Sequence, residues 1–387
     1  MIKILIIEDE EPIRRVLLRI LTEEDSSYEV HEAFDGKDGL KKINNNNYDL
    51  ILCDIKMPGM DGIEVLESIK VSNKTLPFIM LTGHGNVSTA VEAMKLGAYD
   101  FISKPPDLNR LLNSVRHALE NKNLVSENII LKKQVARKYH IIGESKAIKA
   151  IHDLIDKVAP TEARVLITGE NGTGKELVAH NLHQKSQRSK SPFVEVNCAA
   201  IPSELIESEL FGHIKGAFTS AIKDRSGKFE SANNGTLFLD EIADMSLAAQ
   251  AKVLRALEEN KVQRVGGNKD ISVNVRVIAA TNKDLNLEIK NGNFREDLFH
   301  RLAVILIEVP TLKSRKDDIG LLVEHFVNTL SKDQGLEIKR FDSNAVELLK
   351  NYPWSGNIRE LRNVIERLMI LGNNPITSEN INQFAPK

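Results

Sequence analysis

One glycine-rich segment has the composition and setting of a phosphate-binding loop. It follows an apolar run at residues 164–168 and precedes residues 177–183, which have the pattern of a helix. Glycines let successive backbone N–H groups turn toward a phosphate, and a lysine at the start of the helix reaches the terminal phosphates of a nucleotide. The residues expected to bind that nucleotide are Gly169, Glu170, Asn171, Gly172, Thr173, Gly174, Lys175 and Glu176.

A second segment supplies the acidic groups that such a site requires. An apolar run ends in Asp240 and Glu241, which suit the binding of Mg²⁺ and the orientation of a water molecule, respectively. Either motif alone has a bland interpretation, as a glycine turn or a core strand. The two together, in this order, indicate a nucleotide-hydrolysing site.

The first 120 residues contain a separate group of polar residues, each placed just after an apolar run. They are Glu8, Asp9, Asp54, Thr82 and Lys104. The carboxyl ends of parallel strands meet at one edge of a sheet, so these side chains should converge. Three carboxylates repel one another unless a cation lies among them, which predicts a Mg²⁺ site. The hydroxyl and the ammonium group complete a pocket for a phosphoryl group on Asp54, whereas any one of these residues alone would be read as a helix cap.

The elements that must position these residues alternate regularly along the chain. In the first 120 residues, helical patterns separate short apolar runs at residues 4–7, 50–53, 78–81 and 99–102. From residue 139 onward the same alternation returns, with apolar runs at residues 164–168, 194–197, 237–240, 275–281 and 304–310. This order predicts an α/β fold with two parallel sheets, each covered by helices.

Composition excludes several other classes. The net charge is −2, so overall electrostatics gives no reason to expect nucleic-acid binding. Cys53 and Cys198 lie in apolar runs and are expected to be reduced core residues, not a disulfide or a metal site. The apolar start is too short for a signal peptide, and no apolar run is long enough to span a bilayer. A cytoplasmic protein without membrane contacts is expected.

The acidic pocket and its elements resemble the receiver domain of two-component response regulators, over residues 1–121. The resemblance implies a flavodoxin-like, five-stranded parallel sheet and a sensor histidine kinase as partner. It also implies that Asp54 accepts the phosphate, that Asp9 and Asp54 bind Mg²⁺ with help from Glu8, and that Thr82 and Lys104 contact the phosphate.

Two further features of this segment are read through the same resemblance. Phe101 resembles the aromatic residue that reorients on activation, with ordinary core packing as the alternative. The step from Lys104 to Pro105 has the form in which the family uses a cis peptide, which is plausible only before proline.

The second half resembles the AAA+ domain of bacterial enhancer-binding proteins, the activators of sigma-54 RNA polymerase, and is closest to the nitrogen-regulator type. The match covers residues 139–386, and its most specific piece is the segment at residues 209–221. That segment resembles the GAFTGA loop, which contacts the sigma factor. The residues implied to bind this partner are Gly216, Ala217, Phe218, Thr219, Ser220 and Ala221.

The same resemblance implies the roles of an ATP-hydrolysing site. Lys175 and Asp240 hold the phosphates and Mg²⁺, Glu241 activates water, Asn197 restrains Glu241, and Asn282 senses the γ-phosphate.

Three arginines complete this set. Arg295 and Arg301 reach into the neighbouring subunit's site, and Arg359 senses nucleotide in its own subunit. A site shared between subunits requires ring assembly, so a homo-oligomer is expected, a dimer when inactive and a hexamer or heptamer when active. Solvated helix charges are the alternative reading for either Arg295 or Arg301.

The sequence departs from the family pattern at several positions. Ser220 replaces a glycine and Ile214 a glutamate in the loop, and Lys313 and Ser314 replace an arginine–glutamate pair. Glycine adopts a positive φ at little cost, so Ser220 is expected to stiffen or misalign the loop tip. Glu176, by contrast, fits this family better than the generic phosphate-binding loop, which has serine or threonine there.

The expected domains are a receiver at residues 1–120, a helical linker at 121–138, an α/β ATPase subdomain at 139–312 and a helical lid at 313–387. The linker has a weak coiled-coil pattern and reads equally as a solvated helix. No helix-turn-helix pattern follows the lid, so either the protein lacks its own DNA-binding domain or the sequence is truncated. Two other functions stay open: an AAA+ remodeller of a different partner, and a phosphate-accepting scaffold without a working ATPase.

Overall fold

The computed structural model describes residues 1–72, 75–83, 87–218 and 221–385, and at residues 72, 87, 88, 90 and 126–138 it describes the backbone alone. The chain divides into two compact units, Met1–Val135 and Ala136–Lys387. Within the described part, no helix is both long and apolar enough to cross a membrane.

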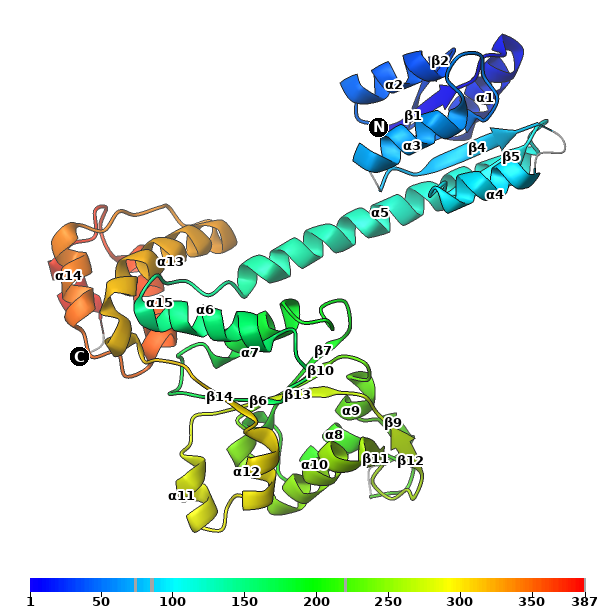
Figure 1. Ribbon diagram of the computed structural model, residues 1–387. Coiled ribbons are helices and arrows are strands. Elements are labelled where there is room, and N and C mark those ends of the chain that lie inside the picture. Colours follow the sequence, from blue (N-terminus) through cyan, green and yellow to red (C-terminus); the bar gives the residue numbers. More distant parts are fainter. Residues whose placement is uncertain (73–74, 84–86, 219–220, 386–387) are drawn as a thin grey trace. The chain divides into compact units, whose positions relative to one another are not determined.

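Unit 1 is a parallel sheet of five strands in the order β2-β1-β3-β4-β5 (Figure 1). The strands are β1 (Ile2–Ile7), β2 (Tyr28–Ala33), β3 (Leu50–Asp54), β4 (Phe78–Thr82) and β5 (Asp100–Ser103). The helices are α1 (Glu11–Glu24), α2 (Gly36–Asn45), α3 (Gly62–Ser72), α4 (Val87–Lys95) and α5 (Leu108–Lys138).

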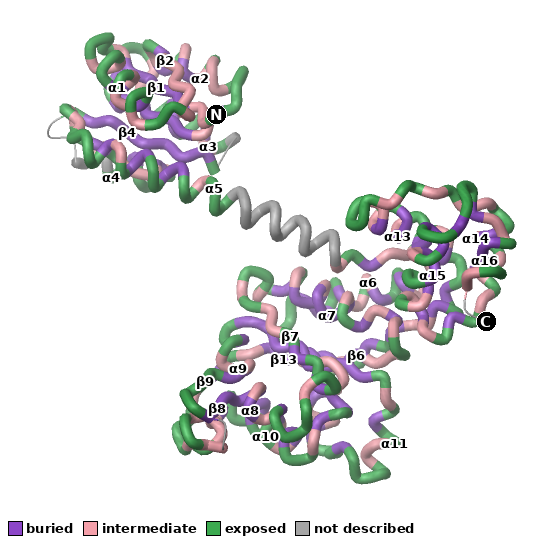
Figure 2. The backbone as a smooth tube through the Cα atoms, turned by 180° about the vertical axis from the view of Figure 1, so that it is seen from behind, coloured by how far each residue is buried: buried purple, intermediate pink, exposed green. Residues whose placement is uncertain are grey.

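Strand alternation explains how unit 1 buries both faces of its sheet. On β1, Ile4 and Ile6 pack with residues of α1 and α5, while Leu5 and Ile7 pack on the other side with residues of α3. Central parallel strands buried on both faces read as continuous apolar runs, as β3 and β4 do here. Figure 2 shows this buried sheet between more exposed helices.

Unit 2 contains a second parallel sheet, in the order β14-β6-β13-β10-β7. Its strands are β6 (Val165–Thr168), β7 (Phe193–Asn197), β10 (Thr236–Asp240), β13 (Arg276–Thr281) and β14 (Ile305–Glu308). Two short antiparallel pairs accompany it: β8 (Gly212–His213) with β9 (Arg225–Ser226), and β11 (Lys261–Gln263) with β12 (Asp270–Ser272).

Helices cover both faces of the second sheet and then form a lid. The helices of the α/β part are α6 (Lys146–Val158), α7 (Lys175–Gln184), α8 (Ile206–Phe211), α9 (Lys228–Ser231), α10 (Leu247–Glu259), α11 (Leu285–Lys290) and α12 (Glu296–Leu302), with 3₁₀ turns η1 (Cys198–Ala200) and η2 (Ile242–Asp244). The lid comprises η3 (Leu312–Asp318), α13 (Ile319–Gln334), α14 (Ser343–Asn351), α15 (Asn357–Leu371) and α16 (Ser378–Phe384). Its core surrounds Trp354, whose Nε1 donates to the Leu349 carbonyl oxygen over 2.7 Å.

Several local expectations differ from the structure in detail. The segment expected as a linker helix continues the last helix of unit 1 as a single α5. Arg295 is the N-cap residue of α12 and Arg301 lies within that helix, so only Arg301 is a helix residue in the structure. Phe101 is 37% exposed, so it is not packed in the core in this state. Lys104–Pro105 is a cis peptide, and Cys53 and Cys198 are buried free cysteines, as expected.

Candidate functional site

The first site lies at the carboxyl ends of the unit 1 strands. Lys104 Nζ is 2.8 Å from Glu8 Oε2 and 2.7 Å from Asp54 Oδ2, so one ammonium group bridges two carboxylates. The carboxylates of Glu8, Asp9 and Asp54 offer oxygens within 4.8 Å of one another. Thr82 ends β4, and its carbonyl oxygen accepts the backbone N–H of Lys104 over 2.7 Å. The four predicted charged side chains therefore converge at one edge of the sheet, and the Thr82 backbone lies beside Lys104 at the same edge.

The charges in this pocket are only partly balanced. Burial raises the pKa of both Glu8 and Asp54 above the ordinary values, repulsion between them adds to the rise for Glu8, and the Lys104 contacts oppose it. Glu8 is completely buried, and within the described part of the chain its Oε2 accepts no hydrogen bond of good geometry despite the nearby lysine. A divalent cation bound by these three carboxylates fits this donor set, because it would satisfy the buried oxygen and relieve the repulsion.

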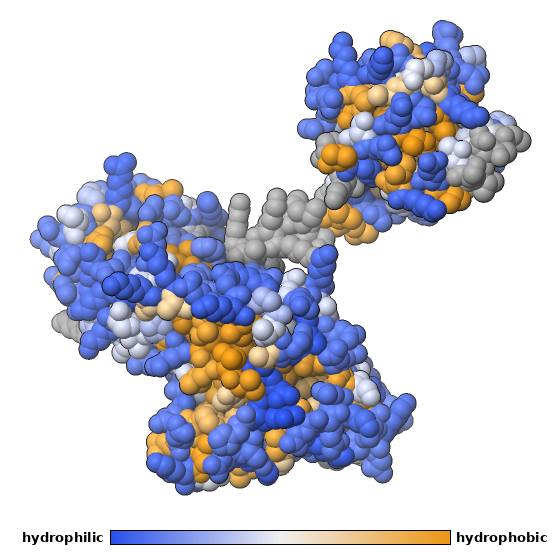
Figure 3. Space-filling view, in the orientation of Figure 1, coloured by the Kyte–Doolittle hydropathy of each residue, from blue (hydrophilic) through white to orange (hydrophobic). Residues whose placement is uncertain are grey.

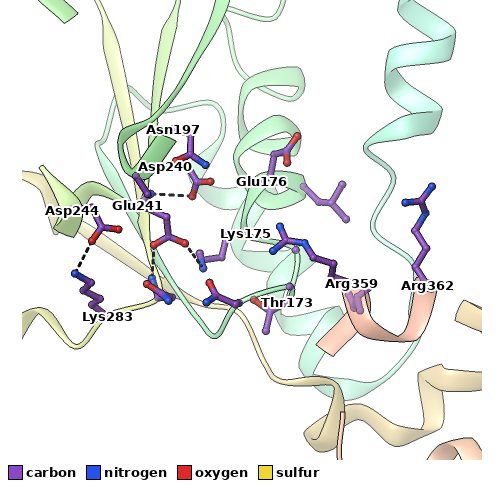
Figure 4. A pocket seen from close by; sticks show the side chains of 17 residues that line it. Thr173, Lys175, Glu176, Asn197, Asp240, Glu241, Asp244, Lys283, Arg359 and Arg362 are labelled. Atoms are coloured by element: carbon purple, nitrogen blue, oxygen red, sulfur yellow. Dashed lines mark hydrogen bonds and ion pairs between the residues drawn. The ribbon is translucent and has the colours of Figure 1, made fainter. Parts of the chain in front are cut away.

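The second site is a cavity of about 570 Å³ in unit 2, formed around the predicted phosphate-binding loop (Figure 4). The loop joins β6 to α7, and Lys175 Nζ donates to the Gly169 carbonyl oxygen over 3.0 Å. Gly172 has a φ of +75°, and a Cβ atom there would lie 2.3 Å from the Gly356 carbonyl oxygen. No larger residue fits at this point, because the lid approaches the loop backbone directly.

Two carboxylates at the end of β10 face the loop. Glu241 has a φ of +51°, which is unusual for a residue with a Cβ atom, and its Oε1 lies 3.3 Å from Lys175 Nζ. Its Oε2 accepts the backbone N–H of Asn282 over 3.0 Å. Asp240 Oδ1 accepts the Glu241 N–H over 3.1 Å, and burial, followed by repulsion from Glu241, raises the pKa of Asp240.

The two predicted asparagines also line this cavity. Asn197 is opposite Asp240 in the pairing of β7 with β10, and its Oδ1 accepts the Ala200 N–H over 3.1 Å. Asn282 follows β13, the strand beside β10. Both asparagines are therefore brought to the carboxylates by adjacent strand ends.

The lid contributes Arg359 to the cavity wall, and a second lid residue, Asn357, which the sequence analysis missed, is bonded to the phosphate-binding loop behind that wall. Asn357 is fully buried with a φ of +53°. Its Nδ2 donates to Glu170 Oε2 over 3.0 Å and to the Asn171 carbonyl oxygen over 3.1 Å, while its Oδ1 accepts the Leu312 N–H over 2.8 Å. Asn357 follows a Pro/Gly turn and precedes Arg359 by two residues, and this position in the sequence could have identified it as a site residue.

Arg295 and Arg301 do not line this cavity. Arg295 forms an exposed bidentate ion pair with Asp297, at 3.0 and 2.6 Å. Arg301 Nη2 donates to the Leu257 carbonyl oxygen over 3.3 Å, and its buried Nε has no hydrogen-bond partner among the residues that the structure describes. The chain's own nucleotide cavity therefore forms without either arginine.

A smaller apolar cavity of about 80 Å³ adjoins the phosphate-binding loop and was also missed by the sequence analysis. Ile141, Ile142 and Ile148 line one side, and Leu322 and Phe326 of the lid line another. Such residues form ordinary core patterns in a sequence, so nothing in their spacing identifies a binding pocket. An apolar pocket next to a phosphate-binding loop is suited to a planar base.

The predicted partner-binding loop is described in part. Gly216, with a φ of +83°, donates its N–H to the Ala221 carbonyl oxygen over 2.9 Å, and the Ala221 N–H donates to the Phe218 carbonyl oxygen over 2.9 Å. The Phe218 ring meets His213 edge-on at a centroid distance of 4.9 Å, and Ala217 packs against Gly266. Thr219 and Ser220 lie outside the described residues.

Comparisons with known proteins agree with this arrangement. Residues 4–116 match the response regulator receiver domain, residues 141–308 the sigma-54 interaction domain, and residues 313–384 the AAA+ ATPase lid domain. Regulatory protein AtoC of Escherichia coli is 45% identical over 377 residues, which cover 97% of this chain and 81% of that protein. Transcriptional regulatory protein ZraR of Salmonella typhimurium is 45% identical over 370 residues, with coverage of 96% and 83%. NtrX from Brucella abortus, solved in complex with ATP, has a TM-score of 0.81 at 40% identity, covering 98% of this chain and 83% of that one.

Proposed function

Because this chain belongs to the sigma-54-dependent response regulators, which join a receiver domain to an AAA+ sigma-54 interaction domain, we propose that it is a phosphorylation-controlled ATPase. Its activity would remodel the sigma-54 RNA polymerase holoenzyme and open promoter DNA in the cytoplasm. The receiver domain implies a kinase as partner, and the sigma-54 interaction domain implies the polymerase.

The observation that carries the ATPase is the convergence of Lys175, Asp240 and Glu241 on one cavity. Lys175 would neutralise the terminal phosphates of ATP, and the adjoining apolar cavity would hold the base. Mg²⁺ bound with ATP would be held by Asp240 and would neutralise phosphate charge. Glu241, its Oε2 fixed by the Asn282 N–H, would take a proton from water as the new bond to the γ-phosphorus forms and the bond to ADP breaks.

Two asparagines and a lid arginine would tune this step. Asn282 would sense the γ-phosphate, and Arg359 would sense the nucleotide from the lid. Asn197 would restrain Glu241 until the loop engages its partner; in this state its Oδ1 accepts the Ala200 N–H, so that restraint would require a change of hydrogen-bond partner.

Assembly would complete the active site. Arg295 and Arg301 lie outside their own cavity, and we assign them to the cavity of the neighbouring subunit in a hexameric or heptameric ring, with a dimer as the inactive state. Apolar side chains exposed near the sheet edge support a packing surface: Val304 is 55% exposed and Leu306 on β14 is 54% exposed. Figure 3 shows apolar side chains gathered on this face of unit 2 within a largely hydrophilic surface.

The receiver would control this assembly. Asp54 would accept the phosphoryl group and Lys104 would stabilise its charge, with Thr82 donating its hydroxyl. Mg²⁺ would be held by Glu8, Asp9 and Asp54. Phosphorylation would add negative charge beside Lys104 and bias the receiver between two states, and ring assembly would respond to that bias.

The loop at residues 216–221 would transmit the result of hydrolysis to sigma-54, with Phe218 and Thr219 as its contacts. One departure favours a second candidate, an AAA+ remodeller of a different protein. Ser220 stands where the family has glycine, and a loop that contacts a different partner would not require glycine at this position. A pull-down of sigma-54 with a transition-state-like nucleotide analogue distinguishes the two candidates, since only the first requires nucleotide-dependent capture.

ATP hydrolysis measured against protein concentration tests the proposal directly. Turnover per protomer should rise with concentration, because an isolated protomer lacks the arginines of its neighbour. Turnover that is undetectable at every concentration, with ATP bound normally, would contradict the ATPase assignment and favour a scaffold.

A further inference from the structure

Three side chains of metal-binding type meet on unit 2 outside the catalytic carboxylates. Glu176 and His180 come from α7 and Glu195 comes from β7, and each offers one ligand atom within 4.8 Å of the other two. In Figure 4 the Glu176 carboxylate lies apart from the Lys175–Glu241 ion pair. None of the roles assigned above uses His180 or Glu195.

Secondary-structure geometry explains the convergence. Glu176 and His180 are four residues apart on α7, so they lie on one helix face. Phe193 and Glu195 are two residues apart on β7, so both point to one side of the strand. Phe193 packs against the His180 ring at a centroid distance of 4.3 Å, while Glu195 Oε1 is hydrogen-bonded to His180 Nε2.

The imidazole is held in a fixed orientation. Tyr139 stacks on the His180 ring, with centroids 3.3 Å apart and planes inclined by 15°. The Tyr139 carbonyl oxygen in turn accepts the side-chain N–H of Asn181 over 2.8 Å. With aromatic groups against it, the ring can present only its edge, and Nε2 on that edge is directed at a carboxylate. Pre-organisation of this kind lowers the cost of binding a ligand at that edge.

The charge balance favours a cation. Among the residues that the structure describes, no lysine or arginine forms an ion pair with Glu176 or Glu195. The side chain of Glu195 is 42% exposed and that of His180 is 9% exposed, so the site opens to solvent on the carboxylate side. That side provides an entry path and room for water ligands.

We propose that Glu176, His180 and Glu195 bind a divalent transition-metal ion. One imidazole nitrogen with two carboxylate oxygens suits ions of the Zn²⁺ type, whereas Mg²⁺ prefers an all-oxygen set. Because Glu176 also lines the nucleotide cavity, the bound ion would neutralise one negative charge at the cavity wall. The site stands on its own geometry and does not rest on the ATPase proposal.

Titration calorimetry of the full chain with Zn²⁺, in an excess of Mg²⁺ that occupies the receiver carboxylates, tests the site. We expect one Zn²⁺ per chain in the wild type. His180→Phe retains an aromatic ring against Tyr139 but removes the ligand nitrogen, and Glu195→Gln removes the charge of one carboxylate. Each variant should weaken Zn²⁺ binding by roughly a hundredfold, at the upper end of what loss of a supporting group costs a metal site.

His300→Gln is the matched control. His300 also follows a glutamate by four residues on a helix, with Nε2 3.8 Å from Glu296 Oε1, but this pair is not part of a three-ligand group among the described residues. The Zn²⁺ affinity of the His300→Gln variant should equal that of the wild type. Equal affinity of wild type and Glu195→Gln would overturn the proposal, as would a loss in His300→Gln as large as in His180→Phe.

Visible absorption of bound Co²⁺ gives a second readout that does not depend on activity. A d–d spectrum that disappears in Glu195→Gln supports the site, and an unchanged spectrum overturns it. Fluorescence of Trp354, the only tryptophan, verifies that each variant is folded.

Discussion

Lys175 and Glu241 form an ion pair inside the nucleotide cavity, with Nζ 3.3 Å from Oε1. The Lys175 side chain is only 7% exposed and that of Glu241 15%, so the attraction is poorly screened by water. The lysine proposed to bind phosphate is thus neutralised by the carboxylate proposed to activate water. Bound ATP would compete with Glu241 for the Lys175 ammonium group.

Glu241→Gln should therefore tighten ATP binding while it slows hydrolysis. Removal of the charge frees Lys175 for the phosphates, and loss of the general base should lower turnover by roughly 10²–10⁴-fold. Fluorescent-nucleotide titration and single-turnover hydrolysis measure the two effects. Asp244→Asn is the control, because Asp244 lines the same cavity but pairs with Lys283 at 2.6 Å and does not neutralise Lys175. Weaker ATP binding by Glu241→Gln would contradict the competition between carboxylate and phosphate.

Arg295→Ala and Arg301→Ala should each lose turnover while ATP binding is retained. A trans-acting arginine contributes roughly 10³–10⁵-fold to phosphoryl transfer in related chemistry. Mixing Arg295→Ala with Lys175→Ala should restore part of the activity, because some interfaces then pair an intact loop with an intact arginine. Arg301 also holds the Leu257 carbonyl oxygen, so its variant needs a thermal-stability control. A mixture no more active than its components would argue against shared sites.

Asp54→Asn should stabilise the receiver at neutral pH in the absence of divalent metal. Burial raises the pKa of Asp54, so the folded state binds its proton more tightly than the unfolded chain does. Stability is therefore lost as pH rises from the ordinary aspartate pKa, about 3.9, through the raised value. Asn cannot ionise, so the variant does not lose stability over this pH range. The free energies of unfolding of the two proteins should become equal in acid. Calorimetry in EDTA across a range of pH measures the difference in stability between variant and wild type. Added Mg²⁺ should reduce this difference. A variant less stable than wild type at neutral pH would refute the prediction.

Asn357→Ala should destabilise unit 2 and weaken ATP binding together. The change removes three hydrogen bonds and leaves the Leu312 N–H buried without its partner, at a cost of roughly 2–4 kcal/mol. Asn357→Gly is the matched variant: it loses the same bonds but tolerates the φ of +53°, so it should be more stable than Asn357→Ala by about 1 kcal/mol. Denaturant unfolding followed by Trp354 fluorescence checks both values. Two variants of equal stability would show that the backbone conformation carries no cost.

Ser220→Gly should improve engagement of sigma-54 without a change in ATP hydrolysis. A serine reaches a positive φ at a cost of roughly 1–2 kcal/mol relative to glycine, enough to weaken the engaged loop about tenfold. Nucleotide-dependent capture of sigma-54 is the measurement, and Thr219→Ala, which should abolish capture while hydrolysis continues, is the comparison. If wild type and Ser220→Gly both hydrolyse ATP and neither captures sigma-54, a different partner becomes the better explanation.

The family and the fold class predicted from the sequence are confirmed, because buried parallel strands and glycine-rich loops leave strong local patterns. Edge strands leave weaker sequence patterns. Strand β2 (Tyr28–Ala33) is mostly half-buried and mixes polar with apolar residues, so it was absent from the predicted apolar runs. The residue roles remain predictions, although the structure gathers the carboxylates of each pocket.

Long-range contacts account for what the sequence did not reveal. Asn357 is separated from Glu170 by 187 positions, and no local pattern announces that an asparagine will bridge two subdomains. The isoleucines of the apolar cavity look like any other core residues until the lid helices close over them. In both cases the information lies in tertiary contacts.

The amide of Asn357 has a mechanical consequence. Its Nδ2 donates to Glu170 Oε2 and to the Asn171 carbonyl oxygen of the phosphate-binding loop, and the neighbouring Ile358 N–H donates to the Gly172 carbonyl oxygen over 2.9 Å. These three bonds start from two consecutive lid residues, so movement of the lid away from the loop would break them together. The lid would therefore separate from the loop in one cooperative step. The rate of that step would set the residence time of ADP in the cavity.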